Sequence, residues 1–174
     1  MWIFGYGSLI WNPGFPHRET VPATLPGYAR RFCMRSIHHR GTHECPGLVL
    51  ALSADEASNC RGLAFAVPDN AQSETLRRLR ERELVSSAYL ERIMYVGLSD
   101  GRRVEAVVYV VDTDHEQYCG DLSLERQARI IARASGGRGP NAEYLLNTAA
   151  RLAELGIEDH DIAWLADRVR VLTK

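Results

Sequence analysis

Residues 92–111 read RIMYVGLSDGRRVEAVVYVV, and this stretch decides the fold class of the chain. Arg92–Leu98 and Val104–Val111 are both rich in β-branched and aromatic residues, as strands usually are. The dipeptide Asp100-Gly101 between them is a strong signal for a tight hairpin turn. The segment therefore predicts two consecutive antiparallel strands.

Further runs of the same character precede this hairpin in the chain. Each run is short and is bounded by Gly, Pro, Asp or Asn, which favour turns. The runs are Trp2–Phe4, Tyr28–Met34, Leu48–Leu52 and Gly62–Val67. About six short strands with tight connections favour a small, strongly curved sheet or barrel.

Helical patterns account for most of the remaining sequence. One helix is expected at Asn70–Leu84, with Asp69 as its N-cap and Gln72 completing a capping box. Three more are expected after Gly120, at Leu122–Ala134, Asn141–Leu155 and Glu158–Leu172. Strands mostly first and helices mostly last predict an α+β fold.

The composition is that of an ordinary globular protein and excludes several classes of function. The 174 residues carry 21 basic and 22 acidic side chains, for a formal net charge of −1. This length predicts a single domain over residues 1–174. The balanced charge predicts no affinity for nucleic acid or acidic membranes, and no apolar run approaches the roughly 20 residues of a membrane span.

Two features of the sequence predict a cytoplasmic protein. The N-terminus lacks the basic n-region and the long apolar h-region of a secretory signal. The four cysteines are scattered without a Cys-x-x-Cys pair, so we expect reduced thiols in a reducing compartment. No feature of the sequence indicates an oligomeric state.

The segment Gly5-Tyr6-Gly7-Ser8-Leu9 is the first candidate site. Glycines permit close approach of a ligand, and successive backbone N–H groups form a small anion-binding concavity. The dinucleotide and phosphate-loop motifs are both incomplete, and Ser8 lacks the Gly-x-Ser-x-Gly setting of a hydrolase nucleophile. A tight turn after an edge strand is the alternative interpretation.

The helix predicted within the strand region carries an acidic residue on its apolar stripe. Glu83 follows Leu76 and Leu79 at helical spacing and is expected to face inward, whereas Glu81 falls on the solvated face. Buried carboxylates are rare unless paired, so Glu83 is either functional or paired with a nearby arginine. Arg82 lies about 100° around the helix and need not neutralise Glu83.

The stretch IHHRGTHEC is a third candidate, with His38, His39, His43 and Cys45 close together. Its spacing matches no familiar zinc pattern, which favours a polar, mobile loop over a metal site. Substrate contacts from Arg40 are a further possibility. A catalytic thiol at Cys45 has little support from its Cys-Pro setting.

The stretch GGRGPNAEY is a fourth candidate, directly before a predicted helix. Asn141 is expected to cap that helix, and a glycine-rich loop at a helix N-terminus is a general site for a ligand carboxylate. Tyr144 falls on the first turn of the helix, where its hydroxyl would face the same cavity.

Together these segments resemble the ChaC family of γ-glutamylcyclotransferases, which act on glutathione. The resemblance runs from Met1 to about Leu155 and depends on a set of motifs in a fixed order. The motifs are Phe4–Trp11 (FGYGSLIW), Tyr28–Phe32 (YARRF), Arg40–Thr42 (RGT), Pro46–Val49 (PGLV), Arg82–Glu83 followed by Tyr89–Leu90, Ala134–Gly136 (ASG) and Gly139–Leu145 (GPNAEYL).

The resemblance implies a small mixed β-barrel flanked by α-helices, with Glu83 as the catalytic base and neither a cofactor nor a metal. The substrate, glutathione or a related γ-glutamyl amide, would contact one set of residues. That set is Ile3, Phe4, Gly5, Tyr6, Gly7, Ser8, Leu9, Arg40 and Tyr144. The residues after Glu83 depart from the glycines that many relatives carry there. The pocket rim is expected from loops 38–45 and 86–89.

The implied reaction is an intramolecular lactam formation. The α-amino group of the substrate attacks its own γ-carbonyl and yields 5-oxoproline and, from glutathione, cysteinylglycine. Such a reaction needs one base and no enzyme nucleophile. The alternatives are a non-catalytic module that binds a γ-glutamyl or thiol ligand, and an amidohydrolase that uses Ser8 or Cys45.

Overall fold

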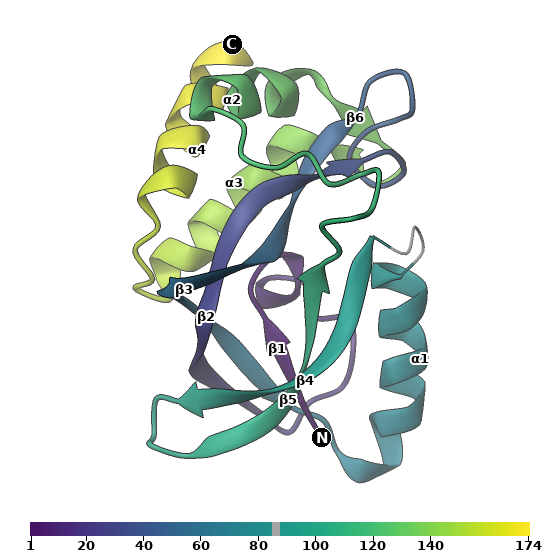
Figure 1. The fold of residues 1–174 in the computed structure, drawn as a ribbon, viewed down its shortest axis with the longest axis vertical. Helices are drawn as coiled ribbons and strands as arrows, with labels where there is room; N and C mark the ends of the chain where they lie inside the picture. The colour runs from purple at the N-terminus through teal and green to yellow at the C-terminus, as the bar shows by residue number, and fades with distance from the viewer. Residues whose placement is uncertain (85–87) are drawn as a thin grey trace. The chain divides into compact units, whose positions relative to one another are not determined.

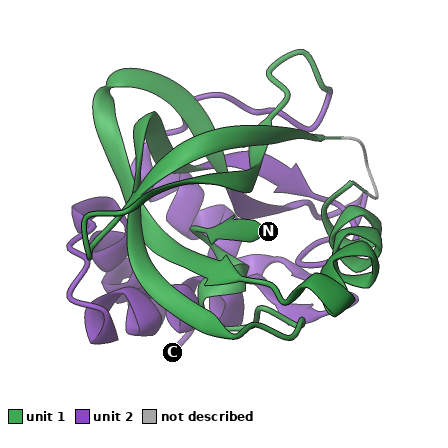
Figure 2. Ribbon diagram, turned by 90° about the horizontal axis from the view of Figure 1, so that it is seen from below, with its two compact units in different colours: residues 1–31, 51–115 green, residues 32–50, 116–174 purple. Residues whose placement is uncertain are grey.

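The computed structural model describes residues 1–84 and 88–174. The chain divides into two compact units, residues 1–31 with 51–115 and residues 32–50 with 116–174, coloured green and purple in Figure 2. The units are interleaved in sequence because two long strands, β2 (Glu19–Ser36) and β3 (Gly47–Ala66), each pass from one to the other. The expectation of a single domain over the whole chain stays a prediction.

The first unit is built on a closed barrel of five strands (Figure 1). The strand order is β1-β3-β2-β4-β5, with β1 at Trp2–Gly5, β4 at Tyr89–Leu98 and β5 at Arg103–Val111. The pairs β1–β3, β2–β4 and β4–β5 are antiparallel, whereas β1 runs parallel to β5. The prediction of a small mixed barrel in an α+β fold is confirmed.

The hairpin predicted at residues 92–111 is confirmed. Residues 89–97 pair in register with residues 103–111, and Gly101 in the turn has φ +92°, a backbone conformation that glycine adopts readily. The same hairpin places Glu91 opposite Tyr109 on neighbouring strands. Directly opposed residues project from the same face of a sheet, so these two side chains are neighbours.

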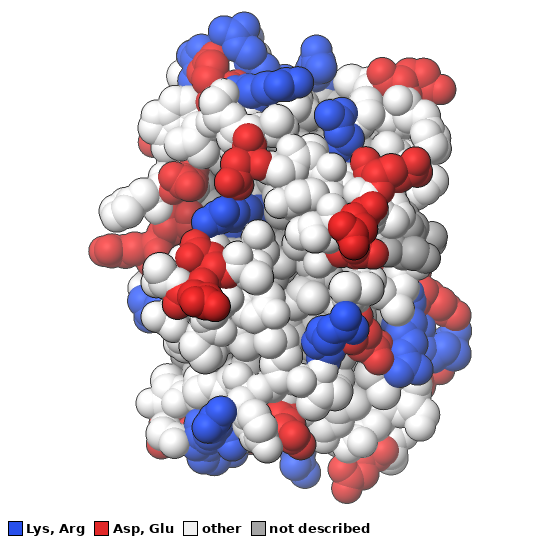
Figure 3. Space-filling view, viewed as in Figure 1, with Lys and Arg blue, Asp and Glu red and all other residues white. Residues whose placement is uncertain are grey.

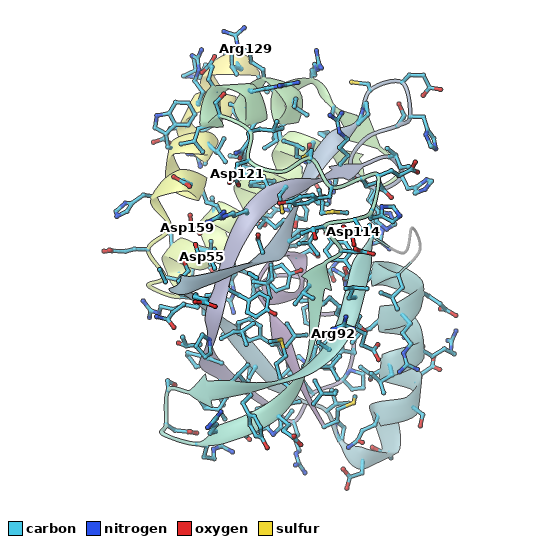
Figure 4. The ribbon with its side chains drawn as sticks, viewed as in Figure 1. Asp55, Arg92, Asp114, Asp121, Arg129 and Asp159 are labelled. Atoms are coloured by element: carbon cyan, nitrogen blue, oxygen red, sulfur yellow. The ribbon has the colours of Figure 1, made fainter. Side chains whose placement is uncertain are left out.

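The prediction of separate strands at Leu48–Leu52 and Gly62–Val67 is wrong, because both belong to the continuous strand β3. The polar residues between them continue the strand with mostly half-buried or exposed side chains. Asp55, labelled in Figure 4, lies in this stretch and pairs with Arg31 on β2 at 2.8 Å. The apolar runs marked only the parts of the strand that face the core.

The helix of the first unit, α1, spans Gln72–Glu83 and follows a short 3₁₀ turn at Asp69–Ala71. The expected cap is wrong, since the residue before α1 is Ala71 and no side chain caps the helix. Gln72 Nε2 instead donates a hydrogen bond to Asp69 Oδ1 at 2.8 Å, which ties the 3₁₀ turn to the helix.

The second unit contains three helices at the predicted places. They are α2 (Leu124–Arg133), α3 (Asn141–Glu154) and α4 (His160–Leu172). Their facing sides bury apolar side chains such as Ile131, Leu145 and Leu165, each at most 1% exposed. The two-residue strands β6 (Ser135–Gly136) and β7 (Gly139–Pro140) pair as a short hairpin in the stretch expected to be a glycine-rich loop.

Among the described residues, no helix has both the length and the apolar character needed to cross a bilayer. On the face drawn in Figure 3, basic and acidic side chains are interspersed, and neither sign gathers into one dominant patch. This mixture agrees with the net charge of −1.

Candidate active site

The first predicted segment forms a turn at the end of β1. The strand ends at Gly5 and a 3₁₀ turn follows at Ser8–Ile10, closed by the hydrogen bond from Ile10 N to the Gly7 carbonyl at 3.1 Å. Ile3 and Phe4 are fully buried. Substrate contacts from Ile3 and Phe4 stay predictions.

Two residues of this turn are required by packing and hydrogen bonding. A Cβ atom added to Gly5 would lie 3.0 Å from both Leu9 Cβ and Phe65 Cε2, which leaves little room for a side chain. Tyr6 donates its hydroxyl to the Tyr109 carbonyl at 2.9 Å, and its own carbonyl accepts from Arg30 Nε at 2.6 Å. The turn is thus fixed to the barrel wall at Tyr6.

Arg82, at the end of α1, fastens that helix to the same turn. Its Nη2 donates to Ser8 Oγ at 2.7 Å, and its Nη1 donates to the carbonyls of Asn12 and Pro13 at 2.9 and 3.4 Å. Its Nε lies 3.2 Å from Glu83 Oε1. One guanidinium therefore joins the first turn to the predicted catalytic carboxylate.

This contact corrects the expectation that Arg82 need not neutralise Glu83. The 100° spacing describes where the side chains leave the helix, but an arginine is long enough to bend back to its neighbour.

The contrast between Glu83 and Glu81 follows the helical spacing. The Glu83 side chain is 18% exposed, whereas Glu81 is 62% exposed and pairs with Arg77 on the outer face of α1. Glu83 is thus mostly shielded from bulk water, and Arg82 links it to the first turn.

Tyr109 on β5 joins Arg82 and Glu83 in this group of side chains, and it was not predicted as a site residue. Its side chain is 2% exposed, and its hydroxyl donates to Glu91 Oε2 at 3.0 Å. Burial is the main reason that the pKa of Tyr109 is raised well above its ordinary value, and the carboxylates of Glu91 and Glu83 add to the rise. The hydroxyl is therefore neutral over the physiological range.

The two predicted site residues of the second unit, Arg40 and Tyr144, contact each other. The Arg40 guanidinium carbon lies 5.8 Å from the centroid of the Tyr144 ring. Arg40 Nη1 lies 3.1 Å from the Pro140 carbonyl, to which it donates, and 3.2 Å from Glu143 Oε1. Tyr144 accepts a hydrogen bond from Leu50 N at 3.3 Å. Substrate contacts from Arg40 and Tyr144 stay predictions.

Asn141 does not cap α3, in contrast to the prediction. The residue before the helix is Pro140, and the Asn141 side chain instead bonds the backbone of Leu48, accepting from its N and donating to its carbonyl, both at 2.7 Å. Asn141 is fully buried. It therefore replaces a strand partner for β3.

The glycines near Asn141 serve close backbone packing. A Cβ atom added to Gly41 would lie 2.1 Å from Gly47 N, and one added to Gly136 would lie 2.5 Å from Gly41 N. Separations this short are incompatible with any side chain, so three separate glycine motifs are explained by their mutual contact.

A family comparison connects this geometry to known proteins. The model of the family described as "ChaC-like protein" matches residues 1–172. The chain belongs to this family.

Two relatives of this ChaC-like protein are named as gamma-glutamylcyclotransferases. The glutathione-specific gamma-glutamylcyclotransferase of Escherichia coli (strain K12) is 38% identical over 172 residues, covering 99% of this chain and 74% of the relative. Gamma-glutamylcyclotransferase 2-3 of Arabidopsis thaliana is 36% identical over 176 residues, covering 98% of this chain and 88% of the relative.

A solved structure has the same fold. The crystal structure of a gamma-glutamyl cyclotransferase specific to glutathione from yeast superposes with a TM-score of 0.89 at 25% identity. The match covers 99% of this chain and 96% of the yeast chain. The likeness agrees with the barrel and helices described above.

The alternative chemistries expected from the sequence gain no support from the ChaC-like protein's geometry. Ser8 Oγ accepts from Arg82, and a guanidinium cannot take up the proton of a nucleophilic hydroxyl. The rings of His38 and His43 lie 5.8 Å apart, yet the described residues contain no group of three or more His, Cys, Asp or Glu side chains suited to a metal ion. In the rim loop expected at 86–89, residues 86 and 87 lie outside the described residues.

Proposed function

We propose that this ChaC-like protein is a glutathione-specific γ-glutamylcyclotransferase, a lyase of glutathione catabolism. It cleaves glutathione to 5-oxoproline and cysteinylglycine. The observation that carries the proposal is the shielded carboxylate of Glu83, which Arg82 joins to the glycine turn that ends β1. The names of the relatives from Escherichia coli and Arabidopsis thaliana support the same reaction class.

Positioning of the substrate supplies much of the catalysis in this proposal. The α-amino group and the γ-carbonyl belong to the same glutamyl chain, so the enzyme holds that chain curled until the nitrogen meets the carbonyl carbon. Intramolecular reactions held in such a geometry gain about 7–11 kcal/mol over their bimolecular counterparts. The carbon–nitrogen bond of the lactam forms as the bond to cysteinylglycine breaks.

Glu83 is the base that frees the attacking nitrogen. An ammonium has no lone pair, so one proton must leave before attack, and a carboxylate in its ionised form is required to accept it. Between an ordinary Glu near pKa 4.3 and an amine near pKa 8 that transfer costs about 5 kcal/mol. The attacking nitrogen loses a second proton as the lactam forms. Protonated Glu83 returns the first proton to the leaving nitrogen and the second also ends on the released amine, so the reaction consumes no proton overall.

The backbone amides of residues 5–9 are proposed to hold the negatively charged parts of the substrate, because N–H groups donate to anions. They form the turn next to the Arg82–Glu83 pair, and each preorganised donor aimed at a developing oxyanion is worth about 3 kcal/mol. The same amides suit the α-carboxylate of the glutamyl group. We include Arg40 and Tyr144 as substrate contacts on the family resemblance alone.

We also propose that the whole chain is one domain and that the protein is cytoplasmic. Residues 1–174 act as one cyclotransferase domain, which the family match over residues 1–172 supports. The protein works in the cytoplasm, where glutathione is a major thiol and keeps protein thiols reduced. Glutathione is the only partner that the proposal requires.

Product analysis over a panel of γ-glutamyl compounds tests the proposed function. We expect 5-oxoproline and cysteinylglycine from glutathione by mass spectrometry, and little turnover of γ-glutamyl amino acids or γ-glutamyl amines. Free glutamate would indicate a hydrolase using Ser8 or Cys45 and would contradict the proposal. Glutathione that binds and is recovered unchanged would indicate a binding module.

A further inference from the structure

A hydrogen-bonded series of three side chains runs from α1 to β5 beside the proposed base. Arg80 donates to both carboxylate oxygens of Glu91, Nε to Oε2 at 3.0 Å and Nη2 to Oε1 at 2.8 Å. Glu91 Oε2 also accepts the hydroxyl of Tyr109 at 3.0 Å. Glu91 is thus bound by a charged fork on one side and a phenol on the other.

The series lies next to Glu83 for reasons of helix and strand geometry. Arg80 and Glu83 are three residues apart on α1 and so share one face of that helix. Glu91 and Tyr109 are opposed across β4 and β5, and Arg80 binds Glu91, so the series reaches the face of α1 that carries Glu83. Tyr109 is also tied to the glycine turn, because its carbonyl accepts the Tyr6 hydroxyl.

The direction of the Tyr109 hydrogen bond limits what its hydroxyl can do next. A tyrosine hydroxyl has one proton to donate and two lone pairs that accept. Glu91 takes the proton, so any further contact of the oxygen is with a donor. Arg92, labelled in Figure 4, donates to the backbone carbonyl of Glu91 and so leaves the Glu91 carboxylate to Arg80 and Tyr109.

We propose that the Tyr109 hydroxyl oxygen accepts a hydrogen bond from the α-ammonium group of the substrate beside Glu83. Glu91, held by Arg80, is a positioning residue that keeps the oxygen turned for this contact. The inference rests on the proposed function and names a residue that recognises its substrate. An ammonium has three N–H groups and needs more acceptors than one carboxylate when it leaves water.

The test compares glutathione with glutaryl-cysteinylglycine, which is glutathione without its α-amino group. In Tyr109→Phe we expect kcat/KM for glutathione to fall roughly 10- to 100-fold, the loss typical of a hydrogen bond to a charged group. The inhibition constant of glutaryl-cysteinylglycine should stay at the wild-type value, because that ligand has no ammonium. Tyr95→Phe is the matched control, since Tyr95 is 50% exposed on β4, and both constants should be unchanged.

Glu91→Gln provides a second variant if Tyr109→Phe does not fold, as judged by thermal unfolding. A carboxamide can also donate, which allows the Tyr109 hydroxyl to turn its proton toward the substrate. We expect a smaller loss of kcat/KM for glutathione and again no change for glutaryl-cysteinylglycine.

Two results would overturn the inference while leaving the proposed function intact. One is an equal weakening of both ligands in the variants, which would indicate a structural role. The other is full activity of a folded Tyr109→Phe. A wild-type protein that makes no 5-oxoproline would instead overturn the proposed function and this inference with it.

Discussion

Arg82 is the residue on which the place of the proposed base depends. Its guanidinium makes contacts to Ser8, to two carbonyls of the following loop, and to Glu83. Arginine suits this position because its planar fork donates in several fixed directions at once. In the Arg-Glu motif, Arg82 thus positions Glu83, and Glu83 is the proposed base.

Arg82→Lys keeps the positive charge and removes the planar guanidinium, so it tests the positioning of Glu83 separately from the charge beside it. A single ammonium cannot reach Ser8, Asn12 and Glu83 together, so we expect α1 to hold Glu83 less accurately. The expected results are a loss of about 1–3 kcal/mol in unfolding free energy and a fall in kcat/KM of roughly 100-fold. Urea unfolding and steady-state kinetics measure the two effects.

Arg78→Lys is the matched control, because Arg78 is 60% exposed and pairs with Glu74 on the outer face of the same helix. We expect it to behave as wild type. An Arg82→Lys variant with wild-type kcat/KM would refute the positioning role.

At the scale of elements, the second unit depends on one buried asparagine between α3 and β3. Asn141→Ala would leave both the N–H and the carbonyl of Leu48 without their present partner in a dry environment. We expect a loss of about 2–4 kcal/mol in unfolding free energy by urea titration. Asn147→Ala on an exposed position of the same helix should change stability little, and equal effects of the two would contradict this account.

The contact between α2 and α4 predicts how acid affects the second unit. Arg168 on α4 binds Glu125 on α2 through two hydrogen bonds, at 2.8 and 2.9 Å, and is the main cause that lowers the pKa of Glu125 from 4.5 to about 2. A carboxylate with a lowered folded-state pKa stabilises the fold above its unfolded value. That stabilisation is lost as the pH falls from about 4.5 through 2.

Glu125→Gln tests this contact in denaturant titrations at several pH values. We expect the variant to be less stable than wild type by a constant amount at neutral pH, with the gap closing between pH 4.5 and about 2. Glu154→Gln is the control, since Glu154 pairs with Arg151 on its own helix and this pair does not join two helices. A gap that widens on acidification would have the wrong sign for this mechanism.

At the scale of the whole molecule, the sequence predicted the elements whose patterns are local. The hairpin around Gly101 and the helices follow from turn chemistry and helical spacing, and they lie close to the expected bounds. The continuous strand β3 was missed because its middle is polar and carries no alternating signal. An extended backbone pairs with its neighbours whatever its side chains are.

The sequence predicted those features of the site that depend on residues close together in the chain. Helical spacing distinguished Glu83 from Glu81. The same spacing misplaced Arg82, because it describes where a side chain leaves the helix and not how far a guanidinium reaches. Asn141 before a helix has the sequence appearance of a cap, and nothing local indicates its bond to Leu48, 93 residues away.

The most direct test of the central claim is the rate of 5-oxoproline formation from glutathione by Glu83→Gln, followed by mass spectrometry. Glutamine keeps the size and loses the proton acceptor, so we predict unchanged glutathione binding and a rate reduced by about 10²–10⁴-fold. Glu81→Gln, changed on the outer face of the same helix, should match wild type. A Glu83→Gln protein that forms 5-oxoproline at the wild-type rate would contradict the assignment of Glu83 as the base.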